Sequence, residues 1–163
     1  KSAIPGVQLD INLQQPKSVG SIKLSSPNPF DKPIIDPNYL SDQRDIEDFT
    51  KAFKHLRYIT EQDAFKNVLN TEISPGANIK TDDDIHSAIR NLTTTGHNPV
   101  STCRMGNDND KSAVLDNKFI VRGTKNLRVV DASAFPDQIN GNINVNINRN
   151  INVNININIK KTE

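Results

Sequence analysis

The chain has 163 residues, enough for one compact domain with a hydrophobic core and short for a typical two-domain enzyme. Its 20 basic and 19 acidic residues are interspersed and give a formal net charge of +1, which argues against nucleic-acid or acidic-membrane partners, since these require a clustered basic face. One cysteine, Cys103, excludes a disulfide framework and a multi-cysteine zinc site, and no apolar run has membrane-spanning length.

The first forty residues predict strands and a loop. Apolar and polar residues alternate over 7–13, the period of a strand with one buried face. Turn-forming residues occupy 14–20, and the alternation resumes over 22–24, so we expect these two strands to form a hairpin. Four prolines within 25–37 predict an extended loop there, because proline fixes the backbone and lacks a donor N–H.

Two amphipathic helices are expected in the middle of the chain. Ser41 or Asp42 can cap a helix whose apolar residues recur at helical spacing over 46–59. Residues 81–84 (TDDD) resemble a capping box, and the apolar residues of 85–92 provide the inward stripe of the second helix.

The last part of the chain combines short strands with a repeat. Residues 119–121 and 127–130 are strand candidates on either side of a turn over 123–126. From 143 to 159, Ile or Val alternates with Asn, broken by Arg149. This pattern fits an amphipathic strand with an Asn ladder, or low-complexity sequence with no fold of its own. We favour the second interpretation, because seventeen residues far exceed the usual strand length.

Two segments carry most of the functional information: residues 95–106 (TGHNPVSTCRMG) and residues 126–136 (NLRVVDASAFP), which continue to Gly141-Asn142. They resemble, in order, two signatures of the glucose–methanol–choline (GMC) flavin oxidoreductases. Four further segments fit the same family in the same order: 16–20, 35–40, 113–116 and 121–123. The resemblance covers residues 13–142 and is specific, because several independent segments match in sequence order.

The resemblance implies an α+β fold with a mainly antiparallel sheet and helices on one face. Residues 1–125 would form the substrate-binding domain, 126–142 a segment returning to the FAD domain, and 143–163 an Asn-rich tail. The chain has no Gly-x-Gly-x-x-Gly fingerprint for a dinucleotide, and it begins without Met or a signal peptide. We therefore expect the chain to be a fragment whose partner is an N-terminal FAD domain that it does not contain. The sequence assigns no cellular compartment to it.

The family implies FAD-dependent oxidation of the CH–OH group of a small alcohol, which requires a proton acceptor and a donor to the developing alkoxide. In the family, a His in the first segment and a His or Asn after the second face the flavin ring. Asn142 matches the second position. Counting back from Cys103, the family's His falls on Asn98, and His97 lies one residue earlier. Either His97 has taken the role, or an amide replaces the base; Ser101 also stands where Gly is usual.

Other residues receive less specific assignments. The resemblance implies that Asp131 and Ala132, with Asn142 and Ile143, meet the FAD, although a carboxylate at this position is equally typical of a turn or helix cap. We expect Cys103 to be a small buried residue, because the sequence indicates no base beside it. His55 and His86 should be solvated, and no metal ligands are predicted.

Two other functions fit the same resemblance. Hydroxynitrile lyases share the GMC fold and retain FAD without net redox chemistry. A truncated, non-catalytic gene product is the third possibility.

Overall fold

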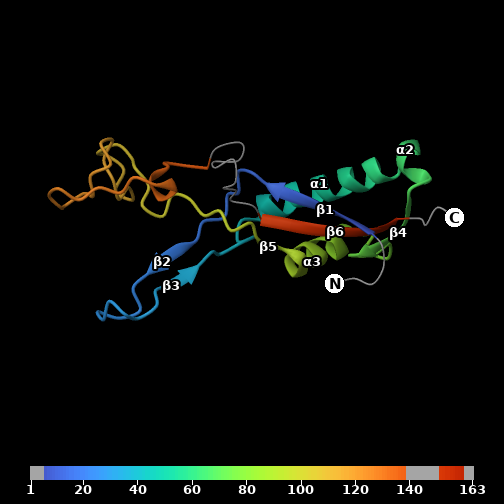
Figure 1. Cartoon of the computed structure of the whole chain (residues 1–163), viewed down its shortest axis with the longest axis horizontal. Helices are drawn as coiled ribbons and strands as arrows, with labels where there is room; N and C mark the ends of the chain where they lie inside the picture. The colour runs from blue at the N-terminus through green and yellow to red at the C-terminus, as the bar shows by residue number, and fades with distance from the viewer. Residues whose placement is uncertain (1–5, 139–150, 160–163) are drawn as a thin grey trace. The chain divides into compact units, whose positions relative to one another are not determined.

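A computed structural model describes residues 6–138 and, for the backbone alone, 151–159 (Figure 1). The chain forms two compact units. The first comprises residues 1–13, 42–95 and 151–163, and the second comprises residues 14–41 and 96–150. The architecture is mixed, with a small antiparallel sheet and helices.

The sheet of the first unit is built around strand β6 (Ile151–Ile159). Strand β6 pairs antiparallel with β1 (Gly6–Leu13), with β4 (Leu69–Ser74) and with the short β5 (Thr94–Thr95). Exposed and half-buried residues alternate along β1, which confirms the strand predicted over 7–13. The predicted hairpin is wrong: β1 takes β6 as its partner, because strand pairing is set by tertiary contacts as well as by nearby turns.

The position of β6 also corrects the interpretation of the repeat. Residues 151–159 adopt the strand alternative and pair with β1 over eight residues, from Leu13 opposite Ile151 to Gly6 opposite Asn158. They are therefore not an unpaired tail in this structure. The rest of the repeat, 143–150, lies outside the described residues.

Both predicted helices are confirmed, with their caps. Helix α1 (Gln43–Thr60) begins at Asp42, whose carboxylate accepts a hydrogen bond from the Arg44 N–H at 3.0 Å. Helix α3 (Asp82–Leu92) begins with a reciprocal capping box between Thr81 and Asp84. A short helix α2 (Asp63–Lys66) lies between α1 and β4.

The core of the first unit lies where α1 meets α3. These helices pack together, and α1 also packs on β1. The large apolar side chains that are fully buried on the two helices are Ile46, Phe49, Phe53, Ile85 and Ile89. Each stabilises the fold by about 1.5–3 kcal/mol when it leaves water. The apolar stripes predicted from the sequence therefore form this core.

The second unit contains fewer regular elements. Strands β2 (Ser21–Lys23) and β3 (Ile34–Asp36) form a two-stranded antiparallel hairpin. A single 3-10 turn, η1, spans Ala132–Ala134. Residues 119–121 and 127–130 pair only through isolated bridges around a turn in which Gly123 and Asn126 have positive φ. The predicted strands thus occur here as a shorter, irregular pairing.

Candidate active site in the second unit

The two signature segments lie against each other in the second unit. Three alternate N–H groups of the first segment donate to the consecutive carbonyls of η1. These bonds run from Ser101 to Ala132 at 3.3 Å, from Cys103 to Ser133 at 2.9 Å and from Met105 to Ala134 at 3.0 Å. Segments about thirty residues apart in the sequence are therefore held as one backbone-bonded structure.

The structure places the two candidate bases differently. His97 is exposed and has a φ of +59°, in the left-handed region. Asn98 is half-buried, and its Nδ2 donates a hydrogen bond to the Gly96 carbonyl in the same loop. Imidazole can accept a proton near neutral pH, whereas an amide cannot. The assignment of either residue as the catalytic base stays a prediction.

Ser101 shows what the departure from glycine does to the loop. Its φ is +65°, a region that glycine adopts readily and other residues adopt at a cost. Its Oγ is buried and has no hydrogen-bond partner among the residues that the structure describes. The sequence difference noted at this position therefore coincides with local backbone strain.

Asp131 caps η1. Its Oδ1 accepts hydrogen bonds from the Ser133 hydroxyl and, at 2.8 Å, from the Ser133 N–H. These bonds, the one from the hydroxyl first, lower the pKa of Asp131 below its usual value. Ala132 is half-buried, and its carbonyl is used by Ser101. Asp131 thus has the capping role, and its expected contact with FAD stays a prediction.

The remaining predicted site residues are placed only in part. Asn142 and Ile143 lie outside the described residues. Cys103 is half-buried and carries a free thiol. Between residues 6 and 138, no group of three or more His, Cys, Asp and Glu side chains is arranged to hold a metal ion.

A guanidinium clamp supports the loop that follows the first signature. Arg122 donates to the carbonyls of Gly106 at 2.8 Å, Asn107 at 2.7 Å and Asp110 at 3.0 Å. The planar, five-donor guanidinium suits three diverging carbonyls. The sequence analysis did not identify this role, because nothing near Arg122 in the sequence indicates carbonyl partners fifteen residues away.

Arg104 forms the second part of this support. Its Nη2 contacts Asp110 Oδ2 at 2.6 Å and also donates to the Ser112 hydroxyl. Hydrogen bonds from Ser112, together with the ion pair to Arg104, lower the pKa of Asp110. The arginine of the signature loop therefore has a structural partner within the second unit.

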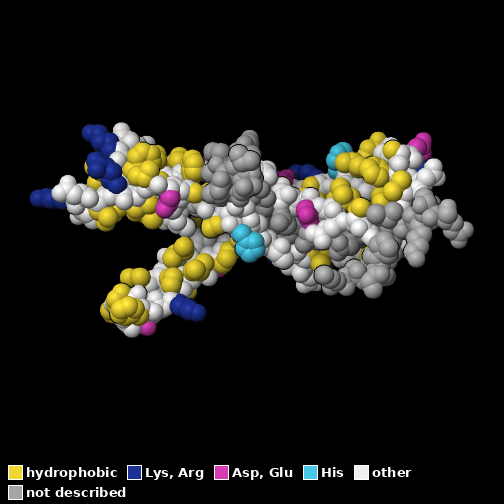
Figure 2. All heavy atoms as spheres, in the orientation of Figure 1, with side chains coloured by type: hydrophobic (Ala, Val, Ile, Leu, Met, Phe, Trp, Pro, Cys, Tyr) yellow, Lys and Arg dark blue, Asp and Glu magenta, His cyan; other side chains and the backbone are white. Residues whose placement is uncertain are grey.

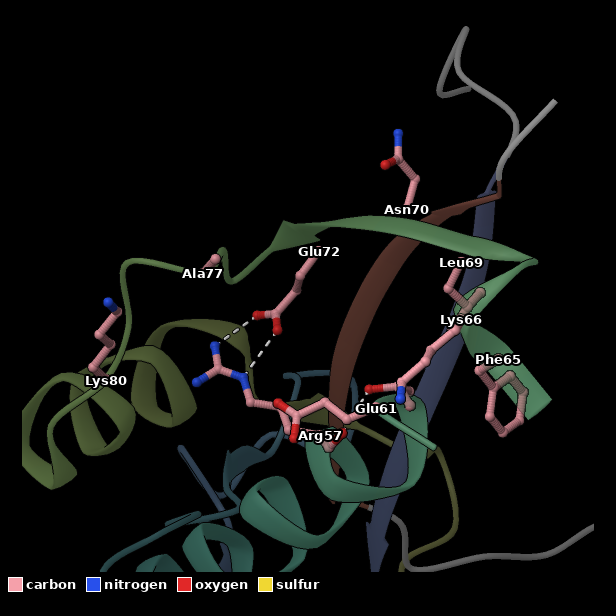
Figure 3. A pocket seen from close by; sticks show the side chains of 10 residues that line it. Arg57, Glu61, Phe65, Lys66, Leu69, Asn70, Glu72, Ala77 and Lys80 are labelled. Atoms are coloured by element: carbon pink, nitrogen blue, oxygen red, sulfur yellow. Dashed lines mark hydrogen bonds and ion pairs between the residues drawn. The ribbon is translucent and has the colours of Figure 1, made fainter. Parts of the chain in front are cut away.

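The first unit contains a separate open pocket of about 590 Å³ between α1, α2 and β4 (Figure 3). Within it, Arg57 forms a bidentate ion pair with Glu72, at 2.9 and 2.8 Å, and donates to the Ile79 and Gly76 carbonyls at 2.5 and 3.1 Å. Its guanidinium also lies 4.4 Å from the centre of the Phe53 ring. Because its donors hold the β4 end in place, Arg57 has a structural role, and the pocket contains none of the predicted site residues.

The two histidines that the sequence predicted to be solvated differ in their exposure. The exposed His55 stacks on Tyr58, with ring centres 6.0 Å apart, and His86 is half-buried on α3. No helix in the described part of the chain has both the length and the apolar character needed to cross a membrane.

Comparisons with known proteins place the chain in a family context. Residues 16–148 match the family model described as GMC oxidoreductase. The chain is 42% identical over 136 residues to mitochondrial choline dehydrogenase of Homo sapiens, covering 83% of this chain and 23% of that protein. It is 45% identical over 127 residues to alcohol dehydrogenase [acceptor] of Pseudomonas putida, covering 78% of this chain and 23% of that protein.

Solved structures give the same result. Pyridoxine 4-oxidase from Mesorbium loti is 36% identical and superposes with a TM-score of 0.70, over 77% of this chain and 24% of that one. An FAD-dependent oxidoreductase from Chaetomium thermophilum is 31% identical, with a TM-score of 0.68 over 75% of this chain and 21% of that one. The chain thus spans about a quarter of the length of the relatives it matches.

Proposed function

Because the chain belongs to the GMC oxidoreductase family, we propose that it is the substrate-side part of an FAD-dependent oxidoreductase acting on the CH–OH group of a small alcohol. The relatives named as choline and alcohol dehydrogenases support this substrate class. The observation that carries the proposal is the set of three backbone hydrogen bonds from 101–105 to 132–134. These bonds bring together the two segments whose residues the family uses beside the flavin.

The domain organisation follows from the same proposal. Residues 1–125 form the substrate-binding domain, with its helices on one face of the sheet, and 126–142 return to the FAD domain. The Asn-rich segment 143–163 follows. The N-terminal FAD domain is then the partner of this chain, with a small alcohol as substrate.

The residues present fit FAD in part. Asp131 is exposed, and it lies beside Ala132 on the backbone-bonded segment, which can meet the cofactor together with Asn142 and Ile143. The chain has no Gly-rich fingerprint for the pyrophosphate, so these residues would hold only one side of the cofactor. When bound, FAD supplies the acceptor for the hydride that leaves the alcohol carbon.

Residues of this chain accept the hydroxyl proton of the alcohol and stabilise the alkoxide that develops. The His97 imidazole can accept the hydroxyl proton, whereas the Asn98 amide cannot accept a proton near neutral pH. Asn142 donates a hydrogen bond to the developing alkoxide. We therefore assign the base to His97, with Asn98 as the alternative given by the spacing from Cys103.

The test uses a chimera in which the whole of this chain replaces the matched segment of the Pseudomonas putida alcohol dehydrogenase. We expect the purified chimera to retain FAD and to oxidise choline or a small primary alcohol with an artificial electron acceptor. A folded chimera that retains FAD but turns over none of these alcohols, while the parent enzyme does, would contradict the proposal.

A further inference from the structure

The β2–β3 hairpin of the second unit exposes an unusual amount of apolar surface. Six of the fifteen exposed large hydrophobic side chains in the described residues lie in the short stretch 19–35. Figure 2 shows hydrophobic side chains gathered over this hairpin. The largest exposed apolar patch of a monomeric soluble protein, about 300–600 Å², is often functional, so this concentration of apolar side chains calls for a functional explanation.

The strand register divides these side chains between two faces. Ile22 lies opposite Ile35, so both point to one face, and Leu24 directly follows the last residue of β2. Their exposures are 52%, 64% and 85%. The other face carries Lys23 opposite Ile34 and is more polar. The Ile22–Ile35 face is therefore apolar and exposed, whereas the opposite face combines a lysine with an exposed isoleucine.

The tip of the hairpin is ordered by its own hydrogen bonds. Asn28 and Ser26 both bond to the Asp31 carboxylate, at 3.0 and 2.5 Å, and Asn28 Oδ1 accepts from the Phe30 N–H at 3.2 Å. This arrangement leaves Phe30 92% exposed on a defined turn. An aromatic side chain presented on a preorganised loop loses little conformational entropy on binding, which favours a contact surface.

The base of the hairpin is fixed as well. A Cβ at Gly20 would meet the Asp36 carbonyl oxygen at 2.3 Å, so only glycine allows this close approach of the two strands. Asn38 Nδ2 donates to the Val19 carbonyl at 2.9 Å. A two-stranded hairpin is marginally stable by itself, so contacts outside the hairpin are expected to contribute to its stability.

We propose that the hairpin face, defined as Ile22, Leu24, Ile35 and Phe30, packs against the part of a longer GMC polypeptide that this chain does not contain. This rests on the proposed function. The hairpin lies within the family-matched residues 16–148, yet the chain corresponds to only 23% of the length of its relatives. In those relatives, the matched residues are therefore one part of a longer polypeptide.

The charges around the hairpin agree with an apolar partner. The segment carries both signs of charge, with three lysines and two aspartates: Lys17, Lys23, Asp31, Lys32 and Asp36. A nucleic acid or an anionic membrane would require a basic face. Burial of apolar surface is therefore the interaction that this face offers.

Cysteine accessibility tests the proposal in the chimera described above. Ile22→Cys, Leu24→Cys and, as control on the opposite face, Lys23→Cys are introduced into the chain alone and into the chimera. Maleimide labelling at each site is followed by peptide mass spectrometry. We expect labelling at 22 and 24 to be about tenfold slower or more in the chimera, because a docked cysteine reacts only while the interface is open, and labelling at 23 to change little.

Two results would overturn the proposal. Equal labelling rates in the two contexts would show that the hairpin face stays uncovered. Labelling of the chain alone that becomes slower as the protein concentration is raised would assign the face to a second copy. Flavin retention and alcohol turnover are measured on the same samples, so protection without turnover removes the proposed function alone, and turnover without protection removes the docking surface alone.

If the chimera does not fold, a second measurement tests the same proposal. The chain is co-expressed with the unmatched part of the Pseudomonas putida enzyme, and the two parts are captured through a tag on one of them. We expect capture with the wild-type chain and Lys23→Asp, and loss of capture with Leu24→Asp. Equal capture of both variants, or no capture of the wild-type chain, would contradict the proposal.

Discussion

Replacement of Ser101 by glycine is expected to stabilise the second unit. Ser101 has a φ of +65°, where the Cβ of an L-residue crowds the backbone at a cost of about 1–2 kcal/mol. Its Oγ is also buried with no partner among the described residues, and a buried polar group without a hydrogen bond costs about 1–3 kcal/mol. Ser101→Gly removes both costs.

The gain is reduced by the greater freedom of glycine in the unfolded chain, which costs about 0.5–1 kcal/mol. With the lower figure for each gain and the upper figure for the loss, the net increase in the free energy of unfolding is about 1 kcal/mol. We therefore expect an increase of about 1–2 kcal/mol for Ser101→Gly.

Urea unfolding of the wild-type chain and variants measures this difference. Ser101→Ala separates the two contributions, because it removes the hydroxyl and keeps the Cβ, and it should give less than the full gain. Thr102→Gly is the matched control at a neighbouring residue without positive φ, and it should destabilise by about 0.5–1 kcal/mol. A Ser101→Gly variant no more stable than wild type would refute the strain argument, and equal gains from glycine and alanine would refute the backbone part of it.

Four further predictions test other parts of the structure. Glu72→Ala should lower the free energy of unfolding by about 2–3 kcal/mol in urea, because it leaves the half-buried Arg57 without its bidentate partner, and Arg57→Ala should cost at least as much, because it also removes the hydrogen bonds to the Ile79 and Gly76 carbonyls. In the chimera, His97→Ala should lower turnover by about 10²–10⁴-fold, with Asn98→His nearly silent; the reverse pattern would assign the base position to Asn98. The pKa of Asp131 is lowered by folding, so the unfolded chain binds more protons and stability falls as the pH falls below the unfolded value of about 4; Asp131→Asn should flatten this fall in pH-dependent unfolding curves. The isolated chain should bind FAD weakly or not at all in a flavin-fluorescence titration, and saturation at micromolar concentrations would contradict this.

Local signals made the helices predictable. The Asp42 cap and the Thr81–Asp84 capping box each satisfy N–H groups within three residues, and the apolar stripes follow from helical periodicity. The alternation over 7–13 likewise predicted β1. Its partner was not predictable, because the turn-like residues 14–20 indicated a local hairpin, whereas the pairing observed joins residues more than 130 positions apart.

The candidate site was predictable only through its resemblance to a family. The two signature segments were identified by their residues, and the structure joins them through backbone bonds to η1. The supports for the neighbouring loop were not foreseen, since Arg122 binds main-chain carbonyls, which every residue possesses. A partner of that kind leaves no mark in the sequence. The hairpin face was similarly hidden, because Ile22 and Leu24 resemble core residues by alternation until their exposure is known.

The register of strand β6 is the feature that the sequence specifies least. Its sequence repeats every two residues, so a shift of two positions along β1 would again place Asn or an aliphatic residue opposite each partner. A one-residue shift would exchange the two faces, and the alternation opposes it, but the pattern gives almost no preference among even shifts. The pairing with β4 is also irregular, with register changes between Leu69 and Glu72 and between Glu72 and Ser74. The sequence can therefore predict that this segment forms a strand. It does not select which nine of the seventeen repeat residues pair, and that choice must come from the lengths of chain that connect the repeat to the sheet.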